Sequence, residues 1–333
     1  MASQDEPFLF VINYQGDKAF IRQLSDINPE ECLFDFEGRG NSSDEMKNNS
    51  EKIAEISWQI APPLYEDYER SFGIVKNNIM AGNSYLTNLT CKVPVSCNLS
   101  LEDIFHRAKG KYKLLLRRKR NLNPFVCFSP ETFVRIKNGR IYSYPMKGTL
   151  DASLPDAEKQ LMEDRKEAAE HATIVDLIRN DLSRVAENVR VDKYRYIDVL
   201  HTNKGDILQT SSEISGRLPE DYQEHLGEIL DAQLPAGSIT GAPKDKTMQI
   251  IHEAEGYDRG FYTGIMGIYD QGELNSAVMI RFVEEEASPS KTEKGKNSEV
   301  SRELYFKAGG GITSKSDCRK EYEEVIQKIY LPI

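Results

Sequence analysis

One glutamate and one lysine near a tight turn are the first candidates for chemistry in this sequence. Asn138-Gly139 is typical of a two-residue β-turn, so we predict a hairpin around it. In that register Glu131 faces Met146, one residue from Lys147, and a carboxyl group meets an amine. An ordinary salt bridge is the simpler interpretation. The alternative is a lysine nucleophile with a glutamate general acid, because burial favours the neutral form of both groups.

Two pairs of glutamates, each spaced three residues apart on a predicted helix, could bind a divalent cation. Glu167 and Glu170 lie in EAAEHATIVDLIRNDL, and Glu321 and Glu324 lie in KEYEEVIQK, so each pair shares a helix face. Carboxylate oxygens are the ligands that Mg²⁺ prefers. Solvated helix faces are the simpler interpretation, because the chain has 53 acidic residues. Glu324 and Lys328 would then form an i, i+4 surface pair.

Two glycine-rich segments could present backbone N–H groups to an anion. GSITGAPK at 237–244 leads into a predicted helix, and the triple glycine 309–311 permits a ligand to approach the backbone closely. The first segment does not have the spacing of a phosphate-binding P-loop. Tyr262 and Arg281, predicted on facing strands of one hairpin, could clamp an anion or could have only a structural role.

The elements that must position these residues follow one another without strict βαβ alternation, which favours an α+β fold with antiparallel sheets. The length of 333 residues fits two domains or one large unit. Periodicity and turn residues predict strands over 8–14, 18–22, 84–90, 125–129, 131–137, 140–146, 189–200, 206–216, 261–270, 274–283 and 301–308. The predicted helices are 64–81, 156–187, 219–232, 243–254 and 317–330. The polar segments 37–52 and 284–300 are predicted surface loops.

Composition excludes several classes of function. A net charge of −10 argues against a general nucleic-acid or anionic-membrane binder, and we interpret the basic run 117–120 as a solvated face. No apolar run is long enough for a transmembrane helix, and the first residues are not typical of a signal peptide. Five scattered cysteines without a C-x-x-C pair are typical of free thiols in a reducing compartment. We therefore expect a cytoplasmic protein.

Five segments, in their order and wording, resemble the chorismate-utilising enzyme family. They are SPETFVRIKNGRIYSYPMKGT, EHATIVDLIRNDLSRV, GSITGAPKDKTMQII, GFYTGIMGIYD and AGGGITSKSDCRKEYEEVIQK. The resemblance runs from about Trp58 to Tyr330. It implies one chorismate-binding catalytic domain over 1–333, with two antiparallel β-sheets packed together and flanked by helices. Residues 1–57 would be a shortened segment without the tryptophan-binding region of feedback-regulated relatives.

Lys147 distinguishes between branches of this family. The aminodeoxychorismate synthases typically read PIKGT where this chain reads PMKGT, whereas anthranilate and isochorismate synthases usually have alanine at the lysine position. Isochorismate and salicylate synthases also use an earlier lysine base, which is Leu86 here. The resemblance therefore implies aminodeoxychorismate synthase component I, with ammonia from a separate glutamine amidotransferase subunit. An anthranilate or isochorismate synthase, or an inactive chorismate-binding activator of an amidotransferase, stays open as an alternative.

The resemblance also implies roles for individual residues. Glu131 would protonate the departing C4 hydroxyl of chorismate as Lys147 adds at C2. The implied ligands of Mg²⁺ are Glu170 and Glu324 directly, and Glu167 and Glu321 through water. The residues implied to bind the substrate are Gly148, Thr149, Ser238, Tyr262, Arg281, Gly309, Gly311 and Lys328. Gln209 stands where many relatives have histidine, so we expect that contact with the ring to be missing.

Overall fold

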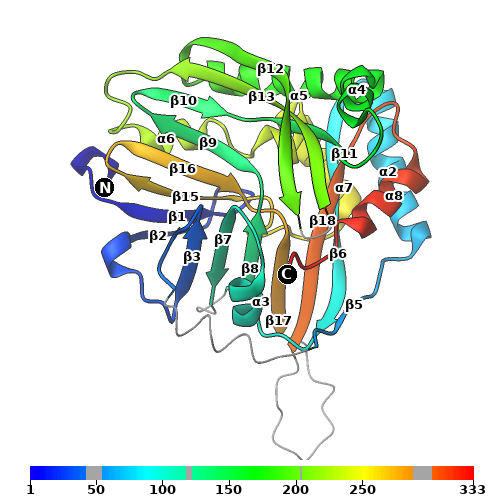
Figure 1. Ribbon diagram of the computed structural model, residues 1–333, viewed down its shortest axis with the longest axis horizontal. Coiled ribbons are helices and arrows are strands. Elements are labelled where there is room, and N and C mark those ends of the chain that lie inside the picture. The colour runs from blue at the N-terminus through cyan, green and yellow to red at the C-terminus, as the bar shows by residue number, and fades with distance from the viewer. Residues whose placement is uncertain (43–54, 118–121, 203–204, 288–301) are drawn as a thin grey trace, which may run out of the picture. The chain divides into compact units, whose positions relative to one another are not determined.

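The computed structural model describes residues 1–42, 55–117, 122–202, 205–287 and 302–333 (Figure 1). Most of the basic run 117–120 and parts of both predicted surface loops lie outside these residues. The described residues form seven α-helices and two antiparallel sheets, so the predicted α+β class is confirmed. Over these residues, none of the helices has the length and apolar character that crossing a membrane requires.

The chain divides into two compact units, each assembled from three stretches of sequence. Each unit contains one of the two sheets. The prediction of a single catalytic domain stays a prediction. Unit 1 consists of Met1–Leu24, Thr132–Ile239 and Gly264–Val278, and unit 2 of Ser25–Glu131, Thr240–Thr263 and Met279–Ile333.

The sheet of unit 1 has the strand order β11-β13-β10-β9-β16-β15-β1-β2, and β12 also pairs with β13. Its strands are β1 (Phe8–Ile12), β2 (Ala19–Gln23), β9 (Thr132–Lys137), β10 (Arg140–Ser143), β11 (Met146–Asp151), β12 (Glu187–Thr202), β13 (Gly205–Arg217), β15 (Ile265–Asp270) and β16 (Glu273–Val278). Its helical segments are η1 (Ala2–Gln4), α4 (Ala157–Glu163), α5 (Arg165–Ser183), α6 (Leu226–Asp231) and η3 (Gly237–Ile239), while η2 (Leu24–Asp26) follows β2. Helices α4 and α5 pack against β11 and β13.

The sheet of unit 2 has the strand order β14-β6-β18-β17-β8-β7-β3-β4, and β5 also pairs with β6. Its strands are β3 (Cys32–Phe36), β4 (Arg39–Gly40), β5 (Trp58–Ile60), β6 (Leu86–Cys97), β7 (Tyr112–Leu116), β8 (Phe125–Ser129), β14 (Gly241–Ala242), β17 (Phe282–Ala287) and β18 (Arg302–Ile312). Its helices are α2 (Tyr65–Met80), α3 (Leu101–Arg107), α7 (Lys244–Glu255) and α8 (Cys318–Gln327). Helix α8 packs against β18, and α7 packs against β6.

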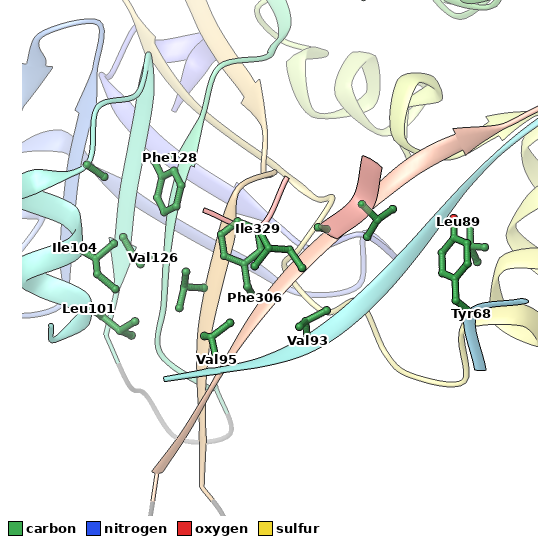
Figure 2. Packing of buried hydrophobic residues seen from close by; sticks show 14 of the residues in the cluster. Tyr68, Leu89, Val93, Val95, Leu101, Ile104, Val126, Phe128, Phe306 and Ile329 are labelled. Carbon is green, nitrogen blue, oxygen red and sulfur yellow. The ribbon is translucent and has the colours of Figure 1, made fainter. Parts of the chain in front are cut away.

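The apolar side chains of α2 lie at helical spacing and join the core of unit 2. Tyr68, Phe72 and Val75 are buried on this helix and belong to the same cluster as Leu89 of β6 and Phe306 of β18 (Figure 2). Full burial of one such side chain is worth about 1.5–3 kcal/mol relative to exposure. This packing therefore holds the helix on β6 and on β18, the strand that carries the triple glycine.

Two predicted helices are shorter than expected. The helix predicted over 156–187 is interrupted at Asp164, whose carboxylate accepts hydrogen bonds from the N–H groups of Lys166 and Glu167 and caps α5. A capped start gives the first turn of α5 partners for N–H groups that would otherwise lack them. The helix predicted over 219–232 begins only at Leu226.

The predicted hairpin is confirmed near its turn, where Lys137 pairs with Arg140. Its predicted length is wrong, because β10 ends before Pro145 and β11 pairs with β13 instead of continuing the hairpin. Proline has no N–H to donate to a ladder. Since β13 and β10 separate β11 from β9 in the sheet, the hairpin register does not place Glu131 opposite Met146.

The prediction that Tyr262 and Arg281 lie on facing strands of one hairpin is also wrong. β15 begins at Ile265 and β16 ends at Val278, so both residues lie outside that hairpin. Thr263 and Arg281 have φ values of 61° and 55°, which are incompatible with an extended strand. The segment predicted as one strand over 274–283 is therefore two strands, β16 and β17.

Candidate active site

Lys147 lies at a β-bulge in β11. The register of β11 against β13 shifts between Lys147 and Thr149, and Gly148 between them has φ 78°, a conformation that glycine adopts most readily. The hydroxyl of Thr210 on β13 donates a hydrogen bond to the Lys147 carbonyl. A bulge changes the direction of the side chains around it, so this irregularity determines where the Lys147 amine points.

The Lys147 amine meets the carboxylates of α5. Lys147 Nζ lies 2.9 Å from Glu170 Oε2, and Lys166 Nζ lies 3.7 Å from Glu170 Oε1. The side chains of Lys147 and Glu170 are 29% and 13% exposed, so water shields this pair only in part. Burial raises the pKa of Glu167, and the nearby Lys147 charge opposes that shift. The amines of Lys147 and Lys166 and the carboxylates of Glu167 and Glu170 therefore form a charged cluster between β11 and α5.

The glycine after Lys147 allows this cluster to be compact. A Cβ atom on Gly148 would lie 3.0 Å from Glu167 Oε2. Thr149 pairs with Gln209 of β13, and Ser238 lies in η3, which packs against α5. Unit 1 thus brings Gly148 into direct contact range of the acidic cluster and places Thr149 and Ser238 on elements that border it.

A second group of predicted residues lies together in unit 2. Lys328 Nζ donates to the Gly309 carbonyl at 3.0 Å and lies 2.8 Å from Glu324 Oε1. Arg281 Nη1 donates to the Lys328 carbonyl at 3.1 Å. The start of β17, the glycines of β18 and the end of α8 are therefore linked by two cationic side chains.

The triple glycine lies within β18, where the strand approaches its neighbours closely. A Cβ atom on Gly309 would lie 2.5 Å from Thr90 Cγ2, which β6 could not accommodate without moving. A Cβ atom on Gly310 would lie 3.7 Å from both Glu321 Oε2 and Lys328 Nζ. The missing side chain of Gly309 therefore lets β18 approach β6, whereas a Cβ atom on Gly310 would make only ordinary contact with the acidic face of α8.

Tyr262 and Glu131 complete the predicted residues of unit 2. Tyr262 is 3% exposed, its ring lies 5.9 Å from that of Phe282, and burial raises the pKa of its hydroxyl. Glu131 is half-buried in the short connection from β8 to β9, and its N–H donates to Ser129 Oγ at 3.1 Å. Both residues thus lie in connections next to strands and not within a strand: Glu131 lies between β8 and β9, and Tyr262 lies before β15.

The four glutamates predicted to bind Mg²⁺ fit that ion in their donor chemistry. One pair lies in each unit. Among the described residues, neither unit has three or more His, Cys, Asp or Glu side chains grouped closely enough to bind a metal ion. In each pair the glutamate predicted to bind Mg²⁺ directly forms an ion pair with a lysine ammonium group. Glu170 pairs with Lys147, and Glu324 pairs with Lys328. Carboxylates that attract an ammonium group also suit a hard divalent ion.

Supporting residues around Lys147 were not predicted. Lys166 could have been found, because its i, i+4 spacing to Glu170 is visible in KEAAE. Thr210 could not have been found from the sequence, because its hydrogen bond to Lys147 depends on the pairing of β11 with β13. A pairing between segments so far apart in sequence has no local signal.

These features define an antiparallel α+β protein that has a lysine among carboxylates in one unit and an arginine, a lysine and glycines in the other. The family model described as chorismate binding enzyme matches residues 14–332, and the chain belongs to this family. The resemblance seen in the sequence is thereby confirmed.

Three comparisons place the chain within this family. It is 47% identical over 330 residues to an uncharacterized PabA-like protein of Haemophilus influenzae, with 99% of this chain and 93% of that protein covered. It is 30% identical over 275 residues to aminodeoxychorismate synthase component 1 of Salmonella typhimurium, covering 79% of this chain and 56% of that synthase. The structure of anthranilate synthase component I from Streptococcus pneumoniae superposes with a TM-score of 0.65 at 25% identity. The superposition covers 82% of this chain and 58% of that synthase. The chain thus spans little more than half the length of the two named synthases.

Proposed function

We propose that this protein is an aminodeoxychorismate synthase component I, which converts chorismate and ammonia to 4-amino-4-deoxychorismate in para-aminobenzoate and folate biosynthesis. The observation that carries this proposal is Lys147 at the bulge of β11, with its amine against Glu170. A covalent route through C2 of the ring requires an amine nucleophile at this position. Enzymes of the family that have alanine there would lack that route.

The proposed reaction has two displacements. Lys147 Nζ, as the neutral amine, adds to C2 of chorismate while Glu131 gives its proton to the C4 hydroxyl, which leaves as water. Ammonia then forms a bond to C4 and gives one proton back to Glu131, while the bond between C2 and Lys147 breaks and restores the neutral amine. No electrons are gained or lost overall, and covalent catalysis divides one difficult displacement into two easier ones.

Mg²⁺ is the proposed cofactor. Glu170 and Glu324 would bind it directly, and Glu167 and Glu321 would reach it through water. When bound, the ion would neutralise the ring carboxylate of chorismate and orient the ring. The pairing of both proposed direct ligands with lysines in this structure supports a cation at these carboxylates.

The second carboxylate of chorismate, on the enolpyruvyl group, would be bound mainly by residues of unit 2. A guanidinium group and backbone N–H groups suit a planar carboxylate. The contacts among Arg281, Lys328 and Gly309 support this assignment. The residues proposed to bind substrate are Gly148, Thr149, Ser238, Tyr262, Arg281, Gly309, Gly311 and Lys328.

Ammonia would come from a glutamine amidotransferase subunit. None of the five cysteines lies in a sequence context typical of a glutaminase nucleophile, and all five are free thiols. Burial raises the pKa of Cys32 and Cys91 to about 12, which opposes thiolate formation. Free thiols also suit the reducing cytoplasm, where we place the protein. If the purified chain used glutamine as well as ammonium salts, this part of the proposal would be wrong.

Product identification tests the proposal directly. The chain would be incubated with chorismate, Mg²⁺ and ammonium, and the products separated and identified by mass spectrometry. We expect 4-amino-4-deoxychorismate from the wild type and none from Lys147→Ala. Lys137→Ala, which removes an exposed lysine from the same sheet, is the matched control and should keep full activity.

The same experiment separates the alternatives. The structural similarity to an anthranilate synthase makes anthranilate the product to look for next, and either anthranilate or isochorismate would overturn the proposal. An inactive activator would give neither a product nor an adduct. Without ammonia, intact-mass analysis should show a chorismate-derived adduct on Lys147 that Lys147→Ala cannot form.

A further inference from the structure

A buried ion pair in unit 2 has no role in the proposed reaction. Glu255, the last residue of α7, and Arg259 have side chains only 1% and 2% exposed. Arg259 Nη2 lies 2.6 Å from Glu255 Oε1, and Arg259 Nε lies 2.8 Å from Glu255 Oε2. Removing two charges from water is often not repaid by their attraction, and apolar replacements of such pairs are often no less stable. Stability alone therefore does not account for this pair.

The two side chains take the place of a strand beside β6. On the edge away from β18, β6 pairs with β14 at its start and with β5 at its end, and no other described strand pairs with that edge. Between them, Arg259 Nη2 donates to the Asn88 carbonyl at 2.7 Å, and Glu255 Oε1 accepts from the Thr90 N–H at 2.8 Å. The ion pair thus makes both kinds of hydrogen bond that a neighbouring strand would make.

These backbone groups belong to the residues opposite the glycines of β18. Asn88 pairs with Gly311, and Thr90 pairs with Gly309. The two strands approach so closely that a Cβ atom on Gly309 would lie 2.5 Å from Thr90 Cγ2. A change in the position of β6 would therefore be transmitted to the glycine backbone.

The same arginine is joined to the segment that carries Tyr262. Arg259 Nη1 donates to Thr263 Oγ1 at 3.4 Å, and the Arg259 carbonyl accepts from the Tyr262 N–H at 3.1 Å. Lys307 of β18, two residues before Gly309, donates to this carbonyl at 3.0 Å. The arginine therefore links the tyrosine, the glycine strand and the neighbouring strand.

We propose that Glu255 and Arg259 are positioning residues that align Tyr262, Gly309 and Gly311 for one carboxylate of chorismate. This inference rests on the substrate-binding role proposed above for those three residues. Glu255 and Arg259 act through the backbone and need not touch substrate. Because preorganised donors bind best when their spacing is held, misalignment weakens substrate binding more than it slows the chemical step.

The variant Arg259→Lys tests this role. Lysine keeps the charge, but it does not have the planar fork that reaches Glu255, Asn88 and Thr263 together. We expect KM for chorismate to rise about tenfold while kcat changes less than about threefold. The Kd for chorismate, measured by calorimetry with Mg²⁺ and without ammonium, should rise in parallel.

A matched control distinguishes positioning from mere stability. Glu286→Gln breaks the pair between Lys92 and Glu286, which is also at 2.6 Å in this sheet but about one quarter exposed. Its KM should stay within about twofold of the wild-type value. If Arg259→Lys only lowered the unfolding midpoint and left KM and Kd unchanged, the pair would be structural and the inference would be overturned.

Two further variants keep the test decisive. The double variant Glu255→Gln with Arg259→Gln leaves no unpaired charge, so it should fold even if Arg259→Lys does not. We expect a raised KM, because a glutamine in place of Arg259 is shorter than arginine and cannot reach Glu255, Asn88 and Thr263 together. Gly311→Ala tests the proposed binding position itself. If its KM were unchanged, both the binding role and the inference would fail. If it rose while Arg259→Lys and the double variant bound normally, only the positioning role would be wrong.

Discussion

Lys147 Nζ lies 2.9 Å from Glu170 Oε2, so the proposed nucleophile is paired with a proposed direct ligand of Mg²⁺. In unit 2 the other proposed direct ligand, Glu324, is paired with Lys328 at 2.8 Å. An ammonium group and a divalent ion bind the same oxygen lone pairs of a carboxylate. The amine and the metal are therefore expected to compete at Glu170.

Replacing the lysine should reveal this competition. Lys147→Met is expected to tighten Mg²⁺ binding about fivefold, because the ion no longer displaces an ammonium group from a partly buried pair. Titration calorimetry, or Mn²⁺ binding followed by electron paramagnetic resonance, measures the change. Lys166→Met removes the same charge from a 51% exposed lysine at 3.7 Å and should have a smaller effect. Equal tightening in both variants would show that only net charge matters.

The glycine at the bulge should be required for both stability and metal binding. Gly148→Ala places a Cβ atom 3.0 Å from Glu167 Oε2 at a φ of 78°. Gly139→Ala is the control, because its φ is 68° but its Cβ atom would meet nothing within 4 Å. The left-handed conformation alone costs about 1–2 kcal/mol. In urea titrations Gly148→Ala should lose more unfolding free energy than Gly139→Ala, and only Gly148→Ala should weaken Mg²⁺ binding.

A buried histidine should make stability depend on pH. His171 is fully buried with Nε2 2.7 Å from Ser212 Oγ, and burial, aided by the Arg195 charge, lowers its pKa from 6.5 to about 4. The unfolded chain therefore binds this proton more readily than the folded chain does. His171 contributes stability above about pH 6.5, and this is lost as the pH falls toward 4, up to about 3 kcal/mol in total.

Urea unfolding at several pH values in this window measures the effect. His171→Gln has no ring to titrate, so its unfolding free energy should fall less steeply between about pH 6.5 and 4 than that of the wild type. The exposed His225 is the control, and His225→Gln should retain the steep dependence. Identical slopes for wild type and His171→Gln would contradict the assignment.

A lysine of α2 should stabilise the turn between β18 and α8. Lys76 Nζ donates to three carbonyls of that turn, at 3.3, 2.8 and 2.9 Å, and these belong to Thr313, Ser314 and Ser316. Lys76→Met removes this donor and should lower the unfolding free energy by about 1–2 kcal/mol. The exposed Lys320 of α8 is the control, and Lys320→Met should change it by less than about 0.5 kcal/mol. Similar values for both variants would show that the carbonyl contacts contribute nothing.

Features with a local cause were predictable. The turn before Arg140 and the helix ends at Gly82 and Gly256 follow from the left-handed conformations that glycine adopts, and the structure has them. The failure at Asp164 shows the limit of this reasoning. Helical periodicity continues across that residue, and the cap that divides α4 from α5 depends on where its side chain points.

The sequence by itself determined the α+β class and the family and indicated candidate site residues, because these follow from composition, short-range periodicity and motif wording. Only the tertiary structure decided that β11 pairs with β13, that a bulge at Gly148 directs Lys147 toward Glu170, and that Arg259 completes the edge of β6. Strand order and register are selected by the summed packing of distant segments, and a shift of one residue reverses the face of every side chain. No local pattern contains that sum, so the pairing of Lys147 with Glu170 emerged only from the fold, whereas the i, i+4 pair of Glu324 and Lys328 was predictable from the sequence.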